Sequence, residues 1–260
     1  MNPLLIDITD KVATVTLNRP EVRNAFDDEV VVQLTQAFTD LNARDEIRCI
    51  VLAASGTMFC SGADVNWMHK MAHYTHSQNL ADAGQLANML HTIYRCNKPT
   101  IAKIQGDVYA GGAGLVAVCD VAVSSDNAVY CLSEVKLGLI PATISPYVIR
   151  AMGARAAHRY FLTAERFTAA QAWRMGFVHE VVTAAELDGK VAEVVQALVN
   201  AGPEAVKRCK ELLQDVAGQA ITPAWVQRTV QTIADVRVSP EGREGLQSFL
   251  QKRKPDWQVG

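Results

Sequence analysis

Hydrophobic and polar positions alternate near the start of the chain in a way that predicts a strand pair. Residues 4–8 and 12–17 carry this alternation and are joined by the polar turn Thr9-Asp10-Lys11. Short continuous apolar runs predict buried strands at residues 49–53, 100–104, 121–124 and 130–132. Helical spacing of apolar positions fills the intervals, at residues 28–43 (with Asp27 as N-cap), 63–95 and 112–119. Strands that alternate with helices predict an α/β fold with a mainly parallel sheet.

The pattern becomes mostly helical beyond Pro141. Two segments, Thr168-Ala169-Ala170-Gln171 and Thr183-Ala184-Ala185-Glu186, match the capping box that begins helices. Gly202-Pro203 ends the helix that the second box begins. A short strand is expected near residues 177–182, and three more helices at residues 204–216, 223–236 and 240–252. We therefore predict an α/β core at residues 1–200 that holds the functional site. The helical region at residues 201–260 either covers the core or packs on another subunit.

Composition excludes several classes of protein. The chain has 260 residues, 49% of them apolar, and a net charge of −2, so it can bury a large core and has no basic excess for nucleic acid. Lys207-Arg208-Cys209-Lys210 is the one basic cluster that an RNA-binding function might use, and it is more simply a solvated helix face. The six cysteines form no Cys-x-x-Cys pair, which favours free thiols over disulfides or zinc. With no signal peptide and no apolar stretch of membrane-spanning length, we expect a cytoplasmic protein.

Two turns rich in small residues each follow an apolar run. Ala110-Gly111-Gly112-Ala113-Gly114 opens a predicted helix, and Phe59-Cys60-Ser61-Gly62-Ala63-Asp64 follows the strand at residues 49–53. Glycines at a strand-to-helix junction leave backbone N–H groups bare where the helix dipole favours negative charge. Two such turns predict a two-donor oxyanion hole. The alternative is a pair of tight turns with close helix packing, and the spacing does not fit a dinucleotide-binding G-x-G-x-x-G motif.

These turns belong to a series of motifs that resembles a known family. Asn18-Arg19-Pro20, Asn24-Ala25-Phe26, the two small-residue turns, Cys119-Asp120 and Ser133-Glu134-Val135-Lys136-Leu137-Gly138 occur in the order found in the crotonase (enoyl-CoA hydratase/isomerase) superfamily. Segments 63–68 and 132–142 most resemble methylglutaconyl-CoA and isohexenylglutaconyl-CoA hydratases. The resemblance implies a spiral of β-β-α units with a C-terminal helical trimerisation region, assembled as a homotrimer or a dimer of trimers. It also implies an acyl-CoA substrate, whose CoA is part of that substrate, with no separate cofactor and no metal.

The resemblance implies three catalytic positions. The backbone N–H groups of Ala63 and Gly111 match those that hold the thioester oxygen while an enolate forms. Glu134 matches the acid/base residue that holds water and exchanges a proton with the substrate. Because Glu134 lies among Leu132, Val135 and Leu137, we expect desolvation to raise its pKa. The alternative for Glu134 is a solvated side chain at a strand end.

Further positions match substrate-binding segments of the family. The CoA nucleotide is expected near Arg19, Arg23 and Ala25, although surface ion pairs explain the two arginines equally well. The C-terminal cations Lys252, Arg253 and Lys254 are a further candidate for the CoA phosphates. Trp67 and Met68 are expected to line the acyl pocket, with core packing as the alternative. The remaining substrate-binding candidates are Ser61, Asp64, Val65, Gly112, Gly114 and Tyr147. His69, His73 and His76 have the spacing of one helical face, and we interpret them as solvated rather than metal-binding.

One departure from the family pattern bears on the reaction. Well-studied hydratases carry a second catalytic Glu where this chain has Gly114, and the segment at residues 141–146 is also changed. A single carboxylate suits a Δ3-Δ2 enoyl-CoA isomerase that uses Glu134 as its sole base. A glutaconyl-type substrate, however, brings its own carboxylate, which a second enzyme carboxylate would repel. We therefore expect hydration of a branched or acidic enoyl-CoA, and hypothesise that Gly114 makes room for that acyl chain.

Overall fold

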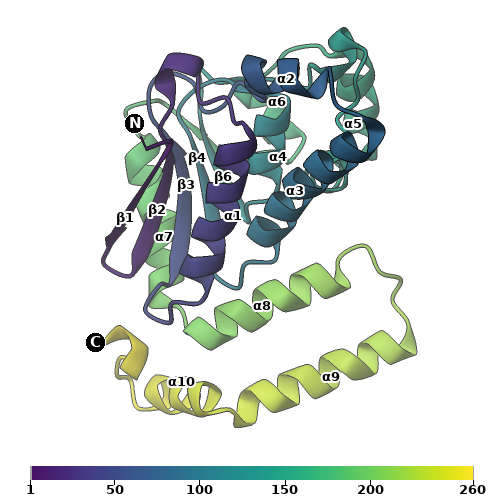
Figure 1. The fold of residues 1–260 in the computed structure, drawn as a ribbon. Coiled ribbons are helices and arrows are strands. Elements are labelled where there is room, and N and C mark those ends of the chain that lie inside the picture. The colour runs from purple at the N-terminus through teal and green to yellow at the C-terminus, as the bar shows by residue number, and fades with distance from the viewer. Residues whose placement is uncertain (1, 260) are drawn as a thin grey trace.

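The computed structural model describes residues 2–259 and contains a six-stranded main sheet (Figure 1). The strand order is β1-β2-β3-β4-β6-β9, and every neighbouring pair is parallel except β1 and β2. The bounds are β1 Leu4–Thr9, β2 Val12–Leu17, β3 Cys49–Ala54, β4 Thr100–Ile104, β6 Val121–Ser125 and β9 Glu180–Val182. The predicted mainly parallel sheet is confirmed.

A second, three-stranded sheet lies beside the first and is a feature that the sequence pattern did not predict. Its order is β5-β7-β8, with β5 parallel to β7 and β7 antiparallel to β8. The bounds are β5 Val108–Tyr109, β7 Val129–Cys131 and β8 Phe167–Thr168. Two of these strands are too short to show any periodicity. An isolated bridge between Cys60 and Val108 ties the loop after β3 to this sheet, directly before the Gly111 turn.

Helices cover both faces of the main sheet. Those of the core are α1 Asp28–Asn42, α2 Val65–Met71, α3 His76–Tyr94, α4 Gly111–Ala117, α5 Ser145–Thr163, α6 Ala169–Arg174 and α7 Leu187–Asn200. Short 3-10 helices are η1 Pro20–Val22, η2 Glu134–Leu137 and η3 Asp256–Gln258. In β3, the side chains of Ile50 and Leu52 lie in the main core. Val51 lies on the other face of the strand, in a cluster with Leu187 of α7. Because β3 is buried on both faces, its sequence is a continuous apolar run.

Two predicted details of the helices need correction, one is confirmed, and one helix was not predicted. The helical stretch at residues 63–95 is two helices, because the chain leaves helical geometry between Met71 and His76. Thr183 is not a helix N-cap: its hydroxyl and N–H both bond Glu186, but α7 begins only at Leu187. The box at Thr168 and Gln171 is confirmed as the start of α6. Helix α5 was not predicted, and it is kinked at Gly153, which has φ +78°.

The C-terminal helices form an arm below the core (Figure 1). They are α8 Pro203–Val216, α9 Pro223–Val238 and α10 Pro240–Leu250, and α9 buries none of its residues. Helix α7 ends at Asn200, and α8 begins at Pro203. No helix within residues 2–259 is long and apolar enough to cross a membrane.

A buried ion pair joins the arm to the core. Lys210 of α8 is 7% exposed, and its Nζ lies 2.6 Å from Asp120 Oδ2 and 3.0 Å from the carbonyl oxygen of Lys98. The same Asp120 oxygen accepts bonds from the N–H and hydroxyl of Thr100. Lys210 therefore points inward, which corrects the interpretation of residues 207–210 as a uniformly solvated face.

Replacing Lys210 with Met is expected to destabilise the protein by about 3 kcal/mol, the lower end of the cost of breaking a buried ion pair, because Asp120 remains partly exposed. The exposed Arg208 of the same helix provides the control, and R208M is expected to change stability by less than about 0.5 kcal/mol. Urea unfolding of the three proteins measures both values. Equal midpoints for K210M and R208M would contradict the anchoring role.

Candidate active site

The turn before α4 presents a free backbone donor. Ala110, the residue before the helix, has φ +47°, a left-handed conformation that a non-glycine residue adopts only when its surroundings hold it there. Its own N–H donates to the carbonyl oxygen of Cys131 at 2.8 Å. Gly111 is the first residue of α4, where N–H groups have no partner within the helix. Within residues 2–259, the Gly111 N–H donates no hydrogen bond.

The loop after β3 presents a second free donor. Phe26 bridges this loop: its N–H donates to the Gly62 carbonyl and its carbonyl accepts from the Asp64 N–H, both at 2.9 Å. In such a parallel bridge the N–H of the intervening residue points to the opposite side. Accordingly, the Ala63 N–H also donates no hydrogen bond in the described part of the chain.

The two turns pack against each other so closely that glycine is required at their contacts. A Cβ atom built on Gly62 lies 3.0 Å from the Ala110 Cβ and 3.7 Å from the Gly111 nitrogen, and Gly62 has φ +92°. A Cβ atom on Gly112 lies 2.9 Å from the Cβ and the carbonyl oxygen of Cys60. The structure therefore brings Ala63 and Gly111 to one place, as the two-donor prediction requires.

Cys60 is a packing residue at this contact. Its Sγ accepts a hydrogen bond from the Gly62 N–H at 3.4 Å, and its carbonyl accepts from the Tyr109 N–H. Burial raises the pKa of the thiol to about 12. The side chain is thus a neutral thiol at physiological pH and not a nucleophile.

Glu134 begins the 3-10 helix η2, and one oxygen of its carboxylate is buried without a partner. Oε2 accepts no hydrogen bond from any group in residues 2–259. Desolvation raises the pKa of this carboxyl, opposed by a weaker hydrogen bond from its own backbone. The predicted direction of the pKa shift is confirmed, although Leu137 is 62% exposed and does not contribute to the burial as expected.

Gly114 faces an apolar side chain. A Cβ atom built on Gly114 lies 2.3 Å from Cγ2 of Ile144 and 3.4 Å from Cδ2 of Leu90. Ile144 is 2% exposed and belongs to the altered segment at residues 141–146. The two departures from the family pattern therefore meet in space. The room left by Gly114 is taken by Ile144, which corrects the hypothesis that this room is open to the acyl chain.

Arg19 and Asp64 hold the loop together. The Arg19 guanidinium contacts the carboxylates of Asp64 and Asp27 at 2.9 and 3.0 Å and donates to the carbonyl of Ala25 at 2.8 Å. The other oxygen of Asp64 accepts from the N–H of Asn66 and caps α2. Both terminal nitrogens of Arg19 and both carboxylate oxygens of Asp64 are thus engaged inside the protein, so the ion-pair alternative describes Arg19 better than a contact with CoA.

The remaining candidates divide by exposure. Trp67 is 3% exposed, packs on Phe26 and donates its Nε1–H to Asp82 at 2.9 Å, so it is a core residue. Met68 and Ser61 are partly exposed, whereas Arg23 and Val65 are exposed. Of the C-terminal cations, Arg253 is paired with both carboxylate oxygens of Glu244.

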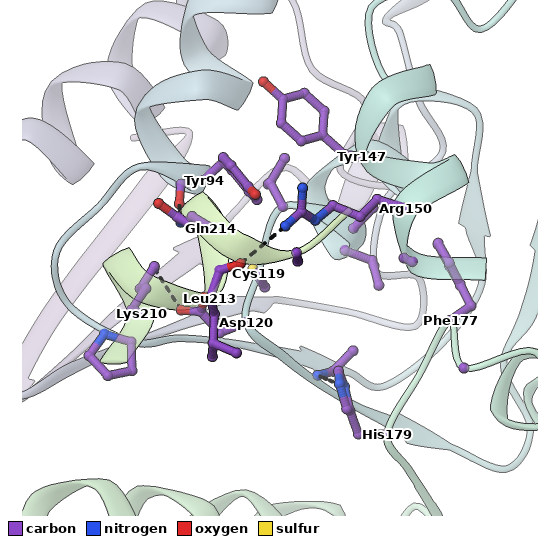
Figure 2. Close-up of a pocket in the computed structure, with 18 of the residues that line it drawn as sticks. Tyr94, Cys119, Asp120, Tyr147, Arg150, Phe177, His179, Lys210, Leu213 and Gln214 are labelled. Atoms are coloured by element: carbon purple, nitrogen blue, oxygen red, sulfur yellow. Dashed lines mark hydrogen bonds and ion pairs between the residues drawn. The ribbon is translucent and has the colours of Figure 1, made fainter. Parts of the chain in front are cut away.

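Tyr147 lies in a separate cavity of about 580 Å³ between α4, α5 and α8 (Figure 2). Its ring packs on Tyr94 at a centroid distance of 5.3 Å, and the Asp120–Lys210 ion pair lies on the opposite wall. The wall includes the last residues of α4, whereas Glu134, Ala63 and Gly111 do not line the cavity. This cavity is therefore separate from the three predicted catalytic positions.

His69, His73 and His76 do not share a helix. His69 lies in α2, His73 follows it, and His76 begins α3. The ring of His73 bonds the carbonyl of His69 through Nδ1 at 2.9 Å. Among residues 2–259, no three His, Cys, Asp or Glu side chains are arranged to hold a metal ion.

Comparisons with known proteins agree with this geometry. The sequence matches the model of the enoyl-CoA hydratase/isomerase family over residues 7–259. The chain belongs to this family. The solved structure of an enoyl-CoA hydratase from Shewanella pealeana shares 40% sequence identity and a TM-score of 0.96, covering 98% of this chain and 96% of that one. The 2,3-dehydroadipyl-CoA hydratase of Escherichia coli is 29% identical over 259 residues, 99% of each chain. The mevalonyl-coenzyme A hydratase sidH of Aspergillus fumigatus is 28% identical, over 96% of this chain and 92% of that protein.

Family membership confirms two predictions. The fold is the α/β crotonase fold with C-terminal helices, and the enzyme is an enoyl-CoA hydratase, a hydro-lyase that acts on acyl-CoA thioesters. The sequence did not reveal which side chains pack against the glycines of the site. These are Phe26 at Gly111, and Leu90 and Ile144 at Gly114. The signal was weak because each acts through a contact with a glycine distant in the chain.

Proposed function

We propose that this hydratase adds water across the 2,3 double bond of a branched or acidic enoyl-CoA, with Glu134 as the one enzyme carboxylate. The N–H groups of Ala63 and Gly111 bind the thioester oxygen. Glu134 holds the water, takes one of its protons as the oxygen attacks C3, and returns that proton to C2. The product is the 3-hydroxyacyl-CoA, and Glu134 ends as the carboxylate from which it began.

The observation that carries this proposal is the unpartnered, buried Oε2 of Glu134. A buried polar atom without a partner costs free energy, and native proteins retain few of them outside functional sites. A raised pKa also brings the carboxyl closer to the range in which it both accepts and donates a proton. Water and substrate supply the missing partners.

An acidic or branched acyl chain is supported by the region around Gly114. Ile144 and Leu90 make this region apolar, so no enzyme carboxylate stands there to repel a carboxylate on the substrate. Two relatives are named for substrates of this kind, one for a dehydroadipyl chain, which is acidic, and one for a mevalonyl chain, which is branched. Methylglutaconyl-CoA combines both properties and is the substrate we propose, in agreement with the resemblance of segments 63–68 and 132–142.

Steady-state hydration kinetics test the choice of substrate. We expect kcat/KM to be at least about tenfold higher for methylglutaconyl-CoA than for crotonyl-CoA, because the larger acyl group makes more contacts with the enzyme in the transition state. The two thioesters carry the same CoA and differ only in the acyl group. An equal or higher value for crotonyl-CoA would contradict the acidic substrate while leaving hydration itself intact.

Gly114 also supports a second candidate reaction. A single base is sufficient to move a proton between C2 and C4, which converts a 3-enoyl-CoA into its 2-enoyl isomer. If this Δ3-Δ2 isomerisation is the enzyme's function, a 3-enoyl-CoA disappears without a change of mass. The product therefore distinguishes the two reactions.

The contact between Gly114 and Ile144 leads to a prediction about a second carboxylate. Gly114→Glu alone is expected to destabilise the protein by about 1–3 kcal/mol, because its Cβ overlaps Ile144. Adding Ile144→Gly is expected to relieve the overlap without restoring full stability, and to lower the preference for methylglutaconyl-CoA over crotonyl-CoA through like-charge repulsion. Thermal unfolding and paired kinetics measure both effects, with I144G alone as the control. A higher preference for the acidic substrate in the double variant would contradict the charge argument.

We also propose that the arm at residues 201–260 packs on a neighbouring copy, as the predicted trimer or dimer of trimers requires. Helix α9 carries Val226, Val230 and Ile233 on its surface, each about half exposed. Apolar side chains spaced along one helix in this way are typical of an interface. Light scattering of the purified protein tests the proposal, and a monomer mass would contradict it.

A further inference from the structure

We propose that Phe26 is a positioning residue that sets the separation of the two oxyanion donors. The inference rests on the proposed role of the Ala63 and Gly111 N–H groups, and it adds a residue that touches neither substrate nor water. Phe26 is 1% exposed, and it contacts one donor turn through its backbone and the other through its ring.

The backbone of Phe26 fixes the direction of the Ala63 N–H. Its N–H and carbonyl hold Gly62 and Asp64, the residues on either side of Ala63, at 2.9 Å each. With both flanking peptides held, the Ala63 N–H can point only away from Phe26. Any side chain at position 26 except proline preserves these two hydrogen bonds, because they are made by the main chain.

The ring of Phe26 supports Gly111. A Cβ atom built on Gly111 lies 2.4 Å from Cζ of Phe26, 3.1 Å from Cε1 and 3.5 Å from Cε2, so the tip of the ring abuts the first residue of α4. Trp67 packs on the ring, at a centroid distance of 6.0 Å and an angle of 57°. The indole is itself held by the hydrogen bond to Asp82. The ring therefore has a fixed neighbour to one side and Gly111 at its tip.

Phe26 therefore acts on both donors: its ring supports the Gly111 N–H, and its backbone fixes the direction of the Ala63 N–H. An oxyanion hole works only when both donors reach the same oxygen, and displacement by a fraction of an ångström reduces its effect. The contacts of Gly62 and Gly112 with the opposite turn also join the two turns, but they involve Cβ positions close to the backbone. Phe26 is the long, rigid element that spans from one turn to the other.

The first test removes the tip of the ring and keeps the backbone. Phe26→Leu is expected to lower kcat about tenfold or more with KM changed less than threefold, because substrate binds mainly through other contacts. Phe38→Leu is the matched control: Phe38 is fully buried in α1 and loses the same ring atoms, and we expect the kcat of F38L to stay within twofold of the wild type. Equal kcat values for F26L and F38L would overturn the inference.

A second test moves side-chain volume from Phe26 to Gly111. Gly111→Ala inserts a methyl group into the ring of Phe26 and is expected to lower kcat strongly. In F26L/G111A the shorter side chain leaves space for that methyl group, so the double variant is expected to be more active than G111A alone. A purely structural role for Phe26 predicts instead that the two losses multiply, and that result would overturn the inference.

A spectroscopic probe separates this inference from the proposed function. The absorption of 4-(dimethylamino)cinnamoyl-CoA moves to longer wavelength when its thioester oxygen is polarised. At saturation we expect a full shift with the wild type and F38L, and a smaller one with F26L. No shift with the wild type would remove the oxyanion role itself, and the inference with it. A full shift with F26L would overturn the inference alone.

Discussion

Glu134→Gln is expected to lower kcat for hydration by about a thousandfold, within the range of 10²–10⁴ that a positioned acid/base contributes. Glutamine keeps the shape of the side chain but neither accepts a proton from water nor returns one to C2. Binding of the acyl-CoA is expected to change little, because in the proposed mechanism Glu134 holds the water rather than the thioester. Steady-state kinetics measure kcat, and a direct binding measurement gives the affinity for the acyl-CoA. Glu211, exposed on α8, gives the control variant E211Q.

The same variant has a predicted effect on stability. Burial raises the pKa of Glu134 above its unfolded value, so the folded state binds the proton more tightly. Stability contributed by this group is therefore present at low pH and is lost as the pH rises from the unfolded pKa through the folded one. E134Q carries no such charge, so its Tm at pH 7 is expected to equal or exceed that of the wild type. Below about pH 4 the wild-type carboxyl is protonated in both states, and the difference in Tm is expected to vanish. A lower Tm for E134Q at pH 7 would show that the carboxylate has a stabilising partner.

Ala63→Pro is expected to lower kcat by about 10²–10³, the loss observed when one oxyanion donor is removed. Proline deletes the Ala63 N–H, which donates no hydrogen bond to any group in residues 2–259. Position 63 already carries a Cβ, so the added ring atoms lie where the amide hydrogen was, on the side where we propose that the thioester oxygen binds. Gly111 is less suitable for the same experiment, because any Cβ there meets Phe26.

Two controls accompany this variant. Ala63→Ser keeps the N–H and is expected to retain activity within a few fold of the wild type. Proline also restricts the preceding Gly62, so the thermal transition of A63P must be measured to show that the protein is folded. A folded A63P with unchanged kcat would refute the donor role of Ala63, and the oxyanion hole would need another pair of groups.

Much of the fold could be predicted because the central strands are buried on both faces. The ends of β2 and β4 coincide with the predicted ones, since the alternation in β2 and the apolar run in β4 each end at a polar residue. Helix α5 escaped prediction because Gly153 interrupts it and its surface-facing residues give little periodicity. The second sheet escaped because its pairings join strands of two or three residues, whose partners are chosen by tertiary contacts.

The parts of the site that depend on close backbone contacts could be predicted from glycines in the sequence. The parts that depend on side chains distant in the sequence could not. Gly111 and Gly62 indicate close approach in the sequence itself, and the structure brings their turns together. The filling of the space at Gly114 by Ile144 has no local signal, because the two residues are thirty positions apart and meet only through the packing of α4 on α5. For the same reason, Phe26 could be recognised as part of a motif but not as the support of Gly111.

The most direct test of the central claim is the fate of labelled water. Methylglutaconyl-CoA and a 3-enoyl-CoA are each incubated in ¹⁸O-water with the wild type and with E134Q. The masses of the acyl-CoA products are then measured by mass spectrometry. One-glutamate hydration predicts that the wild type adds one labelled water to methylglutaconyl-CoA and that E134Q adds almost none in the same time. An isomerised 3-enoyl-CoA without any incorporation of label would contradict the account.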